Sequence, residues 1–148
     1  MPKLLDKINA DRLESLKSGL FGAATLGLAV NLANTGNFWL AAQDTRLTEL
    51  LPDPNPIYWL IRSAIALLSG FLFGVTYRYI VRADNRNPHL RSGAVLAFGL
   101  VRGLAQIEIA LTSPELLAIA GVGAIESLLL FAAARLVLDW AIDRQWIG

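Results

Sequence analysis

Two long apolar stretches, SGAVLAFGLVRGLAQIEIALT (Ser92–Thr112) and LLAIAGVGAIESLLLFAAARLVLDW (Leu116–Trp140), follow each other with only three residues between them. Each is long enough to cross the hydrocarbon core of a bilayer as a helix, which takes about 20 residues. Each also contains ionisable residues: Arg102 and Glu108 lie in the first stretch and Glu126 in the second. A charge at the centre of a membrane helix costs about 2.5–3.5 kcal/mol, so each of these groups needs a partner or a function.

The composition of the whole chain supports an integral membrane protein of one domain, residues 1–148. Hydrophobic residues make up 55% and charged residues only 17% of the 148 residues, whereas soluble domains have about 25% charged residues. A net charge of +1 offers no concentrated basic surface for nucleic acid. The absence of cysteine excludes disulfides and thiolate metal sites.

Four segments are long and apolar enough to span a membrane, at about residues 18–38, 57–81, 92–111 and 114–142. Lipid offers no hydrogen-bond partner to backbone groups, and no segment shows the alternation of a barrel strand, so each span is predicted to be a helix. The sequence therefore predicts an all-α bundle of four transmembrane helices.

Basic residues are distributed unequally between the two ends of these spans. They concentrate before the first span and in the middle loop, residues 82–91, which includes Arg82, Arg86 and Arg91, whereas the first outer connection has only Arg46 and the last has none. The positive-inside rule therefore predicts that both termini and the middle loop face the cytoplasm or stroma. The three loop arginines could hold anionic lipid headgroups or dock a partner subunit.

Two further segments show the spacing of short surface helices. Residues 1–17 place leucine and isoleucine at helical intervals among charges of both signs, which predicts an amphipathic helix at the membrane surface, with a solvated tail as the alternative. Phe38, Trp39 and the leucines up to Leu51 predict an interfacial helix that Pro52, Pro54 and Pro56 end.

Small residues recur at intervals of four in every span. Helices in lipid associate through close packing at such residues, so these stripes predict either a compact bundle or faces for dimerisation. The residues expected to pack helices together are Gly19, Ala23, Gly27, Gly70, Gly74, Gly99 and Gly103, with a further face around Gly123 in the last span.

Matching the depths of the intramembrane charges, at about 1.5 Å per residue, predicts three ion pairs. These are Arg62 with Glu108, Arg102 with Glu126, and Arg135 with Asp139, which are four residues apart on one helix face. Such pairs would fix the order and register of the helices. In the alternative, Glu126 and Glu108 take part in proton or cation passage, with Arg102 as a charged gate.

The sequence offers no group suited to catalysis or metal binding. It has no G-x-S-x-G, H-E-x-x-H or P-loop motif. The single histidine, His89, has only Asp84 near it in the sequence, so we expect a solvated loop residue and not a metal ligand. The sequence therefore predicts a protein that is not an enzyme and that needs no cofactor.

Three segments, SGFLFGVTYRYIVR (69–82), NPHLRSGAVLAFGLVRGLAQIE (87–108) and ESLLLFAAARLVLDWAI (126–142), resemble a family of small, largely uncharacterised four-span membrane proteins of cyanobacteria, with relatives in plastids. The resemblance covers about the C-terminal two-thirds of the chain and carries over no activity and no functional residue. It implies a photosynthetic host and a thylakoid or plasma membrane location. Together with the small size and balanced charges, it leads us to expect an accessory or assembly protein that packs against a larger membrane complex. A small oligomeric channel or transporter is the alternative.

Overall fold

The computed structural model describes residues 2–43, 55–84, 87–112 and 116–148 of the chain. These residues form four long helices and no strand: α1 (Pro2–Gln43), α2 (Pro56–Ala83), α3 (Pro88–Ala110) and α4 (Leu117–Asp143). Each helix is long and apolar enough to cross a membrane. The prediction of an all-α protein with four helices able to span a membrane is therefore confirmed for the described residues.

The starts of α2 and α3 are set by the same local sequence, Asn-Pro. The side chains of Asn55 and Asn87 accept hydrogen bonds at 3.0 Å from the backbone N–H groups of Ile57 and His89. Proline suits the first position of a helix because its missing N–H would have no partner there. The Asn87–Pro88 cap explains why α3 begins four residues before the predicted start of that span.

α1 is one continuous helix of 42 residues, about 63 Å long at 1.5 Å per residue. We expected residues 1–17 to form a separate surface helix, but residues 2–17 continue into the first predicted span without a break. No proline or other strong breaker interrupts this segment, and its polar side packs on α2. Of the interfacial helix expected around residues 38–51, Phe38 and Trp39 lie in the last turns of α1, and residues 44–54 are outside the described part of the chain.

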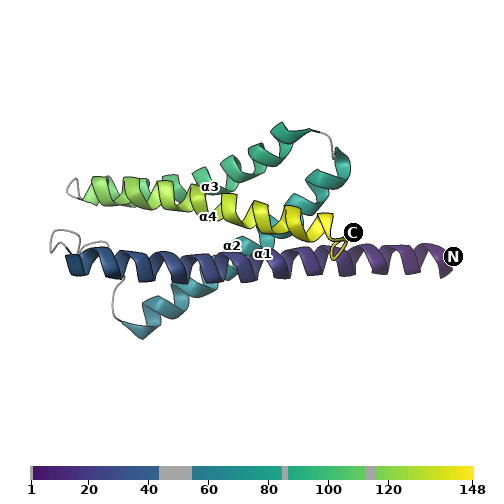
Figure 1. Cartoon of the computed structure of the whole chain (residues 1–148), viewed down its shortest axis with the longest axis horizontal. Coiled ribbons are helices and arrows are strands. Elements are labelled where there is room, and N and C mark those ends of the chain that lie inside the picture. Colours follow the sequence, from purple (N-terminus) through teal and green to yellow (C-terminus); the bar gives the residue numbers. More distant parts are fainter. Residues whose placement is uncertain (1, 44–54, 85–86, 113–115) are drawn as a thin grey trace.

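The helices form two pairs, α1 with α2 and α3 with α4, and α1 also packs on α4. Figure 1 shows both chain termini and the α2–α3 connection at one end of the molecule, here called the terminal end. The C-terminal ends of α1 and α3 lie at the opposite end, here called the hairpin end, with the start of α4 beside them. α2 crosses α1, so α2 and α3 move apart from the terminal end toward the hairpin end (Figure 1).

Glycines let the backbones of α1 and α2 touch. A Cβ on Gly70 would collide with the backbone of Gly22, and one on Gly74 with the carbonyl of Ser18. At the same point the Ser18 hydroxyl donates to the Gly74 carbonyl at 2.6 Å. The other residues of the predicted face on α1 also lie on α2: Gly19 against Phe71, Gly27 against Leu67, and Ala23 against Gly70.

Small residues bring α3 and α4 together in the same way. A Cβ on Gly103 would lie 3.0 Å from the Cα of Ala124, and one on Gly99 would lie 2.7 Å from Leu128 Cδ2. Gly123 leaves room for the side-chain oxygen of Gln106. The predicted small residues thus lie at contacts within each helix pair.

Between the two pairs lies a core of aromatic rings. Phe73 packs on Phe98 and Phe131 with ring centroids 5.4 and 5.2 Å apart, and it also contacts Tyr77. Phe73, Phe131 and Tyr77 are almost fully buried. These rings join α2, α3 and α4 on the terminal side of Arg102.

Candidate functional site

A small polar cavity of about 150 Å³ lies among all four helices, toward the hairpin end. Its polar lining comes from Arg62 of α2, Arg102 and Gln106 of α3, and Glu126 of α4, with Asn37 of α1 at its edge. Arg62 lies six residues after the start of α2, and Arg102 lies eight residues before the end of α3. The two arginines are therefore about 9 and 12 Å from the ends of their helices at the hairpin end. Three of the predicted intramembrane charges therefore share one space.

Close packing of α3 on α4 positions the amide of this cavity. The Gln106 Nε2 donates to Ser127 Oγ at 2.9 Å, and it reaches the carbonyl of Gly123 at 3.5 Å. A side chain at position 123 would occupy the place of the Gln106 oxygen. The glycine and the buried serine of α4 therefore hold Gln106 beside Arg102.

The charges in the cavity are not joined by direct ion pairs. Among the residues that the structure describes, none places a carboxylate oxygen within 4 Å of the Arg102 guanidinium, although Glu126 lines the same cavity. One guanidinium nitrogen of Arg102, Nη1, is buried without a hydrogen-bond partner. A buried donor without a partner costs about 1–3 kcal/mol, and more when it is charged. One of the residues that line the cavity therefore carries an unsatisfied donor on its charged group.

The predicted pair of Arg62 with Glu108 is also not formed. Glu108 is exposed and lines neither this cavity nor the larger cleft beside it. It follows Arg102 by six residues, which is about 120° around the helix axis at 3.6 residues per turn. The predicted pair of Arg62 with Glu108 rested on equal depth alone, and depth does not say toward which side of α3 a side chain points.

A second polar cluster, near the terminal end, is centred on Asp139 of α4. Its carboxylate accepts from the Tyr77 hydroxyl at 2.6 Å and lies 2.9 Å from Arg91 Nη1 and 3.5 Å from Arg135 Nε. Arg135 also donates to Ser92 Oγ at 2.9 Å. The structure thus places Arg135 beside Asp139 as the spacing predicted, and it adds partners from α2 and α3.

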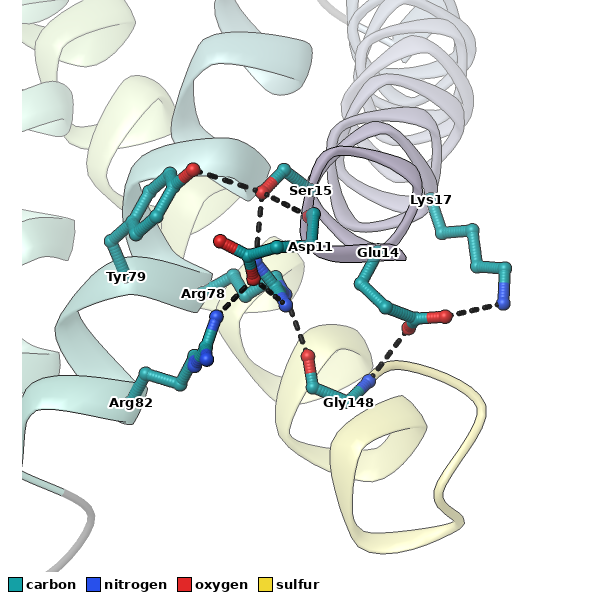
Figure 2. A network of polar contacts seen from close by, with 8 residues as sticks. All are labelled: Asp11, Glu14, Ser15, Lys17, Arg78, Tyr79, Arg82 and Gly148. Atoms are coloured by element: carbon teal, nitrogen blue, oxygen red, sulfur yellow. Dashed lines mark hydrogen bonds and ion pairs between the residues drawn. The ribbon is translucent and has the colours of Figure 1, made fainter. Parts of the chain in front are cut away.

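A third cluster joins α1, α2 and the C-terminal segment at the terminal end (Figure 2). Arg78 is only 3% exposed, and its guanidinium donates to Asp11 Oδ1 and Ser15 Oγ at 2.8 Å each and to the Gly148 carbonyl at 2.6 Å. Arg82 pairs with the same oxygen of Asp11. Buried arginine can satisfy several acceptors at once because its guanidinium is a rigid fork of five donors.

Arg78 was not among the residues for which the sequence predicted a role. Two signals could have found it: Asp11 and Ser15 are four residues apart on α1, and Arg78 and Arg82 are four apart on α2. Two such polar stripes on neighbouring helices are expected to face each other. Tyr77, the partner of Asp139, gave no such signal because the residues one turn away from it on α2, Phe73 and Val81, are apolar and form no polar stripe with it.

The arginines expected to dock lipid or a partner are partly engaged within the chain. Arg82 pairs with Asp11 and Arg91 with Asp139, whereas Arg86 is outside the described residues. The backbone of His89 is held by the Asn87 cap. Within residues 2–43, 55–84, 87–112 and 116–148, no three side chains of the metal-binding types come together.

Comparisons of this chain with protein-family models, with curated proteins and with solved structures find no match. Function must therefore be inferred from the clusters described above.

The Asp139 cluster allows a first prediction. Asp139→Asn removes the charge shared by Arg91 and Arg135 but keeps a group that can hydrogen-bond to Tyr77. We expect a loss of about 1–3 kcal/mol in the free energy of unfolding, measured by denaturant titration in detergent micelles. Asp143→Asn, one turn later on the exposed side of α4, is the matched control and should change stability little. Equal stability of the two variants would contradict a structural role for the cluster.

Proposed function

We propose that the chain is a non-catalytic integral membrane protein that packs against a larger membrane complex as an accessory or assembly factor. The observation that carries this proposal is the N-terminal part of α1, which extends beyond every other helix at the terminal end (Figure 1). Asp11 lies level with Arg78 and Arg82, near the end of α2. The nine residues before Asp11 in α1 therefore extend about 14 Å further.

Polar and apolar side chains are also distributed unequally around the axis of α1 near this extension. Asp11 and Ser15 face α2, whereas Leu13 and Leu16 are 54% and 47% exposed on the other side, and Ile8, one turn before Asp11 on the extension itself, is 40% exposed. A helix that leaves an apolar side uncovered at the edge of a membrane protein is suited to bind a partner surface. The 42-residue length of α1 is about twice what the hydrocarbon core requires, so this side is available outside the core.

The distribution of basic residues supports placing this extension in the cytoplasm or stroma. A partner there would meet the helix extension together with the Arg78 cluster that anchors it to α2. The proposed location is the thylakoid or plasma membrane, and this rests on the resemblance in sequence alone.

A small channel or transporter is the second candidate, because Arg62, Arg102 and Glu126 share a polar cavity inside the membrane. One feature of the described residues disfavours it for a single copy of the chain. Between this cavity and the terminal end lie the packed rings of Phe73, Phe98 and Phe131, which offer no polar group to an ion. The accessory function fits the geometry better.

Crosslinking and affinity purification of the tagged chain from its native membranes test the proposal. We expect a stoichiometric membrane complex that crosslinks to residues 6–16 and is lost in the double variant Ile8→Gln, Leu13→Gln. Lys7→Gln, on the same exposed segment, is the control and should keep the complex. Recovery of the chain alone, or crosslinks only between its own copies, would contradict the proposal.

Reconstitution in liposomes separates the two candidate functions. The accessory proposal expects no ion flux from the purified chain. A pH-dependent flux that Glu126→Gln abolishes in folded protein would favour the channel instead.

A further inference from the structure

A cleft of about 1040 Å³ separates α2 from α3 and opens on the side of the molecule. It arises because the two helices meet near their connection and move apart toward the hairpin end (Figure 1). Its volume is at the upper end of the range for small-molecule sites, about 300–1,000 Å³. In a membrane, a cleft that opens on this side faces the bilayer. The residues that line it indicate which kind of molecule it can bind.

The lining changes in a fixed order along the cleft. At the hairpin end Tyr58 and Trp59 form the rim, in the first turn of α2. Arg62 follows one turn deeper, and Ile65 and Leu72 continue toward the terminal end. Tyrosine and tryptophan prefer the membrane–water interface, and an arginine one turn below can reach the headgroup region along its apolar stem.

α3 forms the opposite wall, which begins with Ile109 at the hairpin end. Gln106 and Arg102 lie at the level of Arg62, and Val101 and Phe98 follow toward the terminal end. A polar band close to the interface and an apolar wall beneath it match a lipid, with its headgroup near the interface and its acyl chains below. A partner helix with only apolar side chains would bring no counter-charge to the arginines of this band.

The charge of the polar band specifies the headgroup. Arg62 and Arg102 line both the cleft and the small cavity, where Glu126 is the one carboxylate among the described lining residues. Two positive charges thus face one negative charge, and the Nη1 donor of Arg102 is buried without a partner. One added negative charge would balance the site. Arginine pairs well with phosphate because its fork of donors matches the phosphate oxygens.

We propose that the α2–α3 cleft binds one anionic phospholipid, whose phosphate pairs with Arg62 and Arg102 and whose acyl chains lie against the apolar walls formed by Ile65, Leu72, Val101 and Phe98. This site is independent of the proposed accessory function, which depends on the opposite end of the molecule. The two proposals can therefore fail separately.

Native mass spectrometry of the full chain tests this site with two lipids of identical acyl chains, phosphatidylglycerol and phosphatidylcholine. We expect one phosphatidylglycerol to be retained per chain and phosphatidylcholine to be released. Arg102→Gln should weaken phosphatidylglycerol binding about ten- to hundredfold, the effect of losing one charge-assisted hydrogen bond. Arg12→Gln, an exposed arginine on α1, is the control for general surface charge and should bind as the unaltered chain does.

A second variant keeps the test valid if Arg102→Gln does not fold. Ala97→Trp fills the apolar part of the cleft without changing any charge, since Ala97 is exposed on its wall. We expect it to lose the lipid as well. Inorganic phosphate, which has no acyl chain, should not displace the lipid.

Four results would overturn the proposal: equal retention of both lipids, unchanged binding in Arg102→Gln, unchanged binding in Ala97→Trp, or displacement by inorganic phosphate. A photoreactive residue at position 97 that labels a polypeptide instead of a lipid in native membranes would also overturn it.

Discussion

Gly74→Leu is expected to separate α1 from α2 and to lower the free energy of unfolding by about 3 kcal/mol or more, the upper end for overpacking a close contact. A Cβ at position 74 would collide with the carbonyl oxygen and the carbonyl carbon of Ser18, and it would lie 3.1 Å from the Cα of Gly19. These are backbone atoms, which cannot move aside as a flexible side chain can. The substitution also breaks the hydrogen bond from the Ser18 hydroxyl to the Gly74 carbonyl.

Gly121→Leu is the matched control for this variant. Gly121 is also inside a transmembrane helix, but a Cβ there would meet nothing within 4 Å. Leucine has the higher helix propensity, by about 0.8 kcal/mol or less, so the control should be neutral or slightly stabilised. The measurement is unfolding of both variants by denaturing detergent, followed by circular dichroism. If Gly74→Leu unfolds at the same point as Gly121→Leu, the direct backbone contact of α1 and α2 is refuted.

The contact between α1 and α2 shows what the sequence could predict about packing. A stripe of small residues four apart, Gly19, Ala23 and Gly27, correctly predicted a close-packed face, since such residues have one main use in lipid. It did not include Gly22, whose backbone meets that of Gly70. Because α2 crosses α1 at an angle, the contact leaves the straight stripe, and a one-dimensional pattern cannot show the crossing.

Among the predicted ion pairs, the sequence was reliable within one helix and unreliable between helices. Arg135 and Asp139 lie four apart on one helix, and local geometry alone brings them together. The expected pairs of Arg62 with Glu108 and of Arg102 with Glu126 connect different helices, where rotation about each axis matters as much as depth. Depth matching placed Arg62 with Glu108 and Arg102 with Glu126 at two different levels, but the structure brings Arg62, Arg102 and Glu126 to one cavity.

The length of α1 was the part of the fold that composition described least well. Charges of both signs before residue 18 suggested a change from a surface helix to a span, yet α1 continues through this point. The side chains of Asp11 and Ser15 face α2, where both accept hydrogen bonds from Arg78. An arginine at the end of one span can thus extend its neighbour past the membrane surface.

That role of Arg78 leads to the second large effect. Arg78→Gln is expected to lower the free energy of unfolding by about 3 kcal/mol, because it removes the hydrogen bonds of a buried charged donor, each of which contributes about 1.5–3 kcal/mol. Arg78 is 3% exposed and its three hydrogen bonds reach α1 and the C-terminal segment (Figure 2). Glutamine is too short and has too few donors to restore them.

Arg82→Gln is the control, because Arg82 pairs with the same oxygen of Asp11 but its side chain is 52% exposed. Exposed ion pairs contribute about 0–1 kcal/mol, so we expect a small change. Beyond stability, Arg78→Gln should release both segments that this residue holds, and limited proteolysis should then cut before Ser15 and within residues 144–148. Rapid cutting at these sites in Arg78→Gln but not in Arg82→Gln would identify the buried guanidinium as the group that fixes the extension of α1. Equal protection in both variants would show that helix packing at Ser18 and Gly74 suffices to hold it.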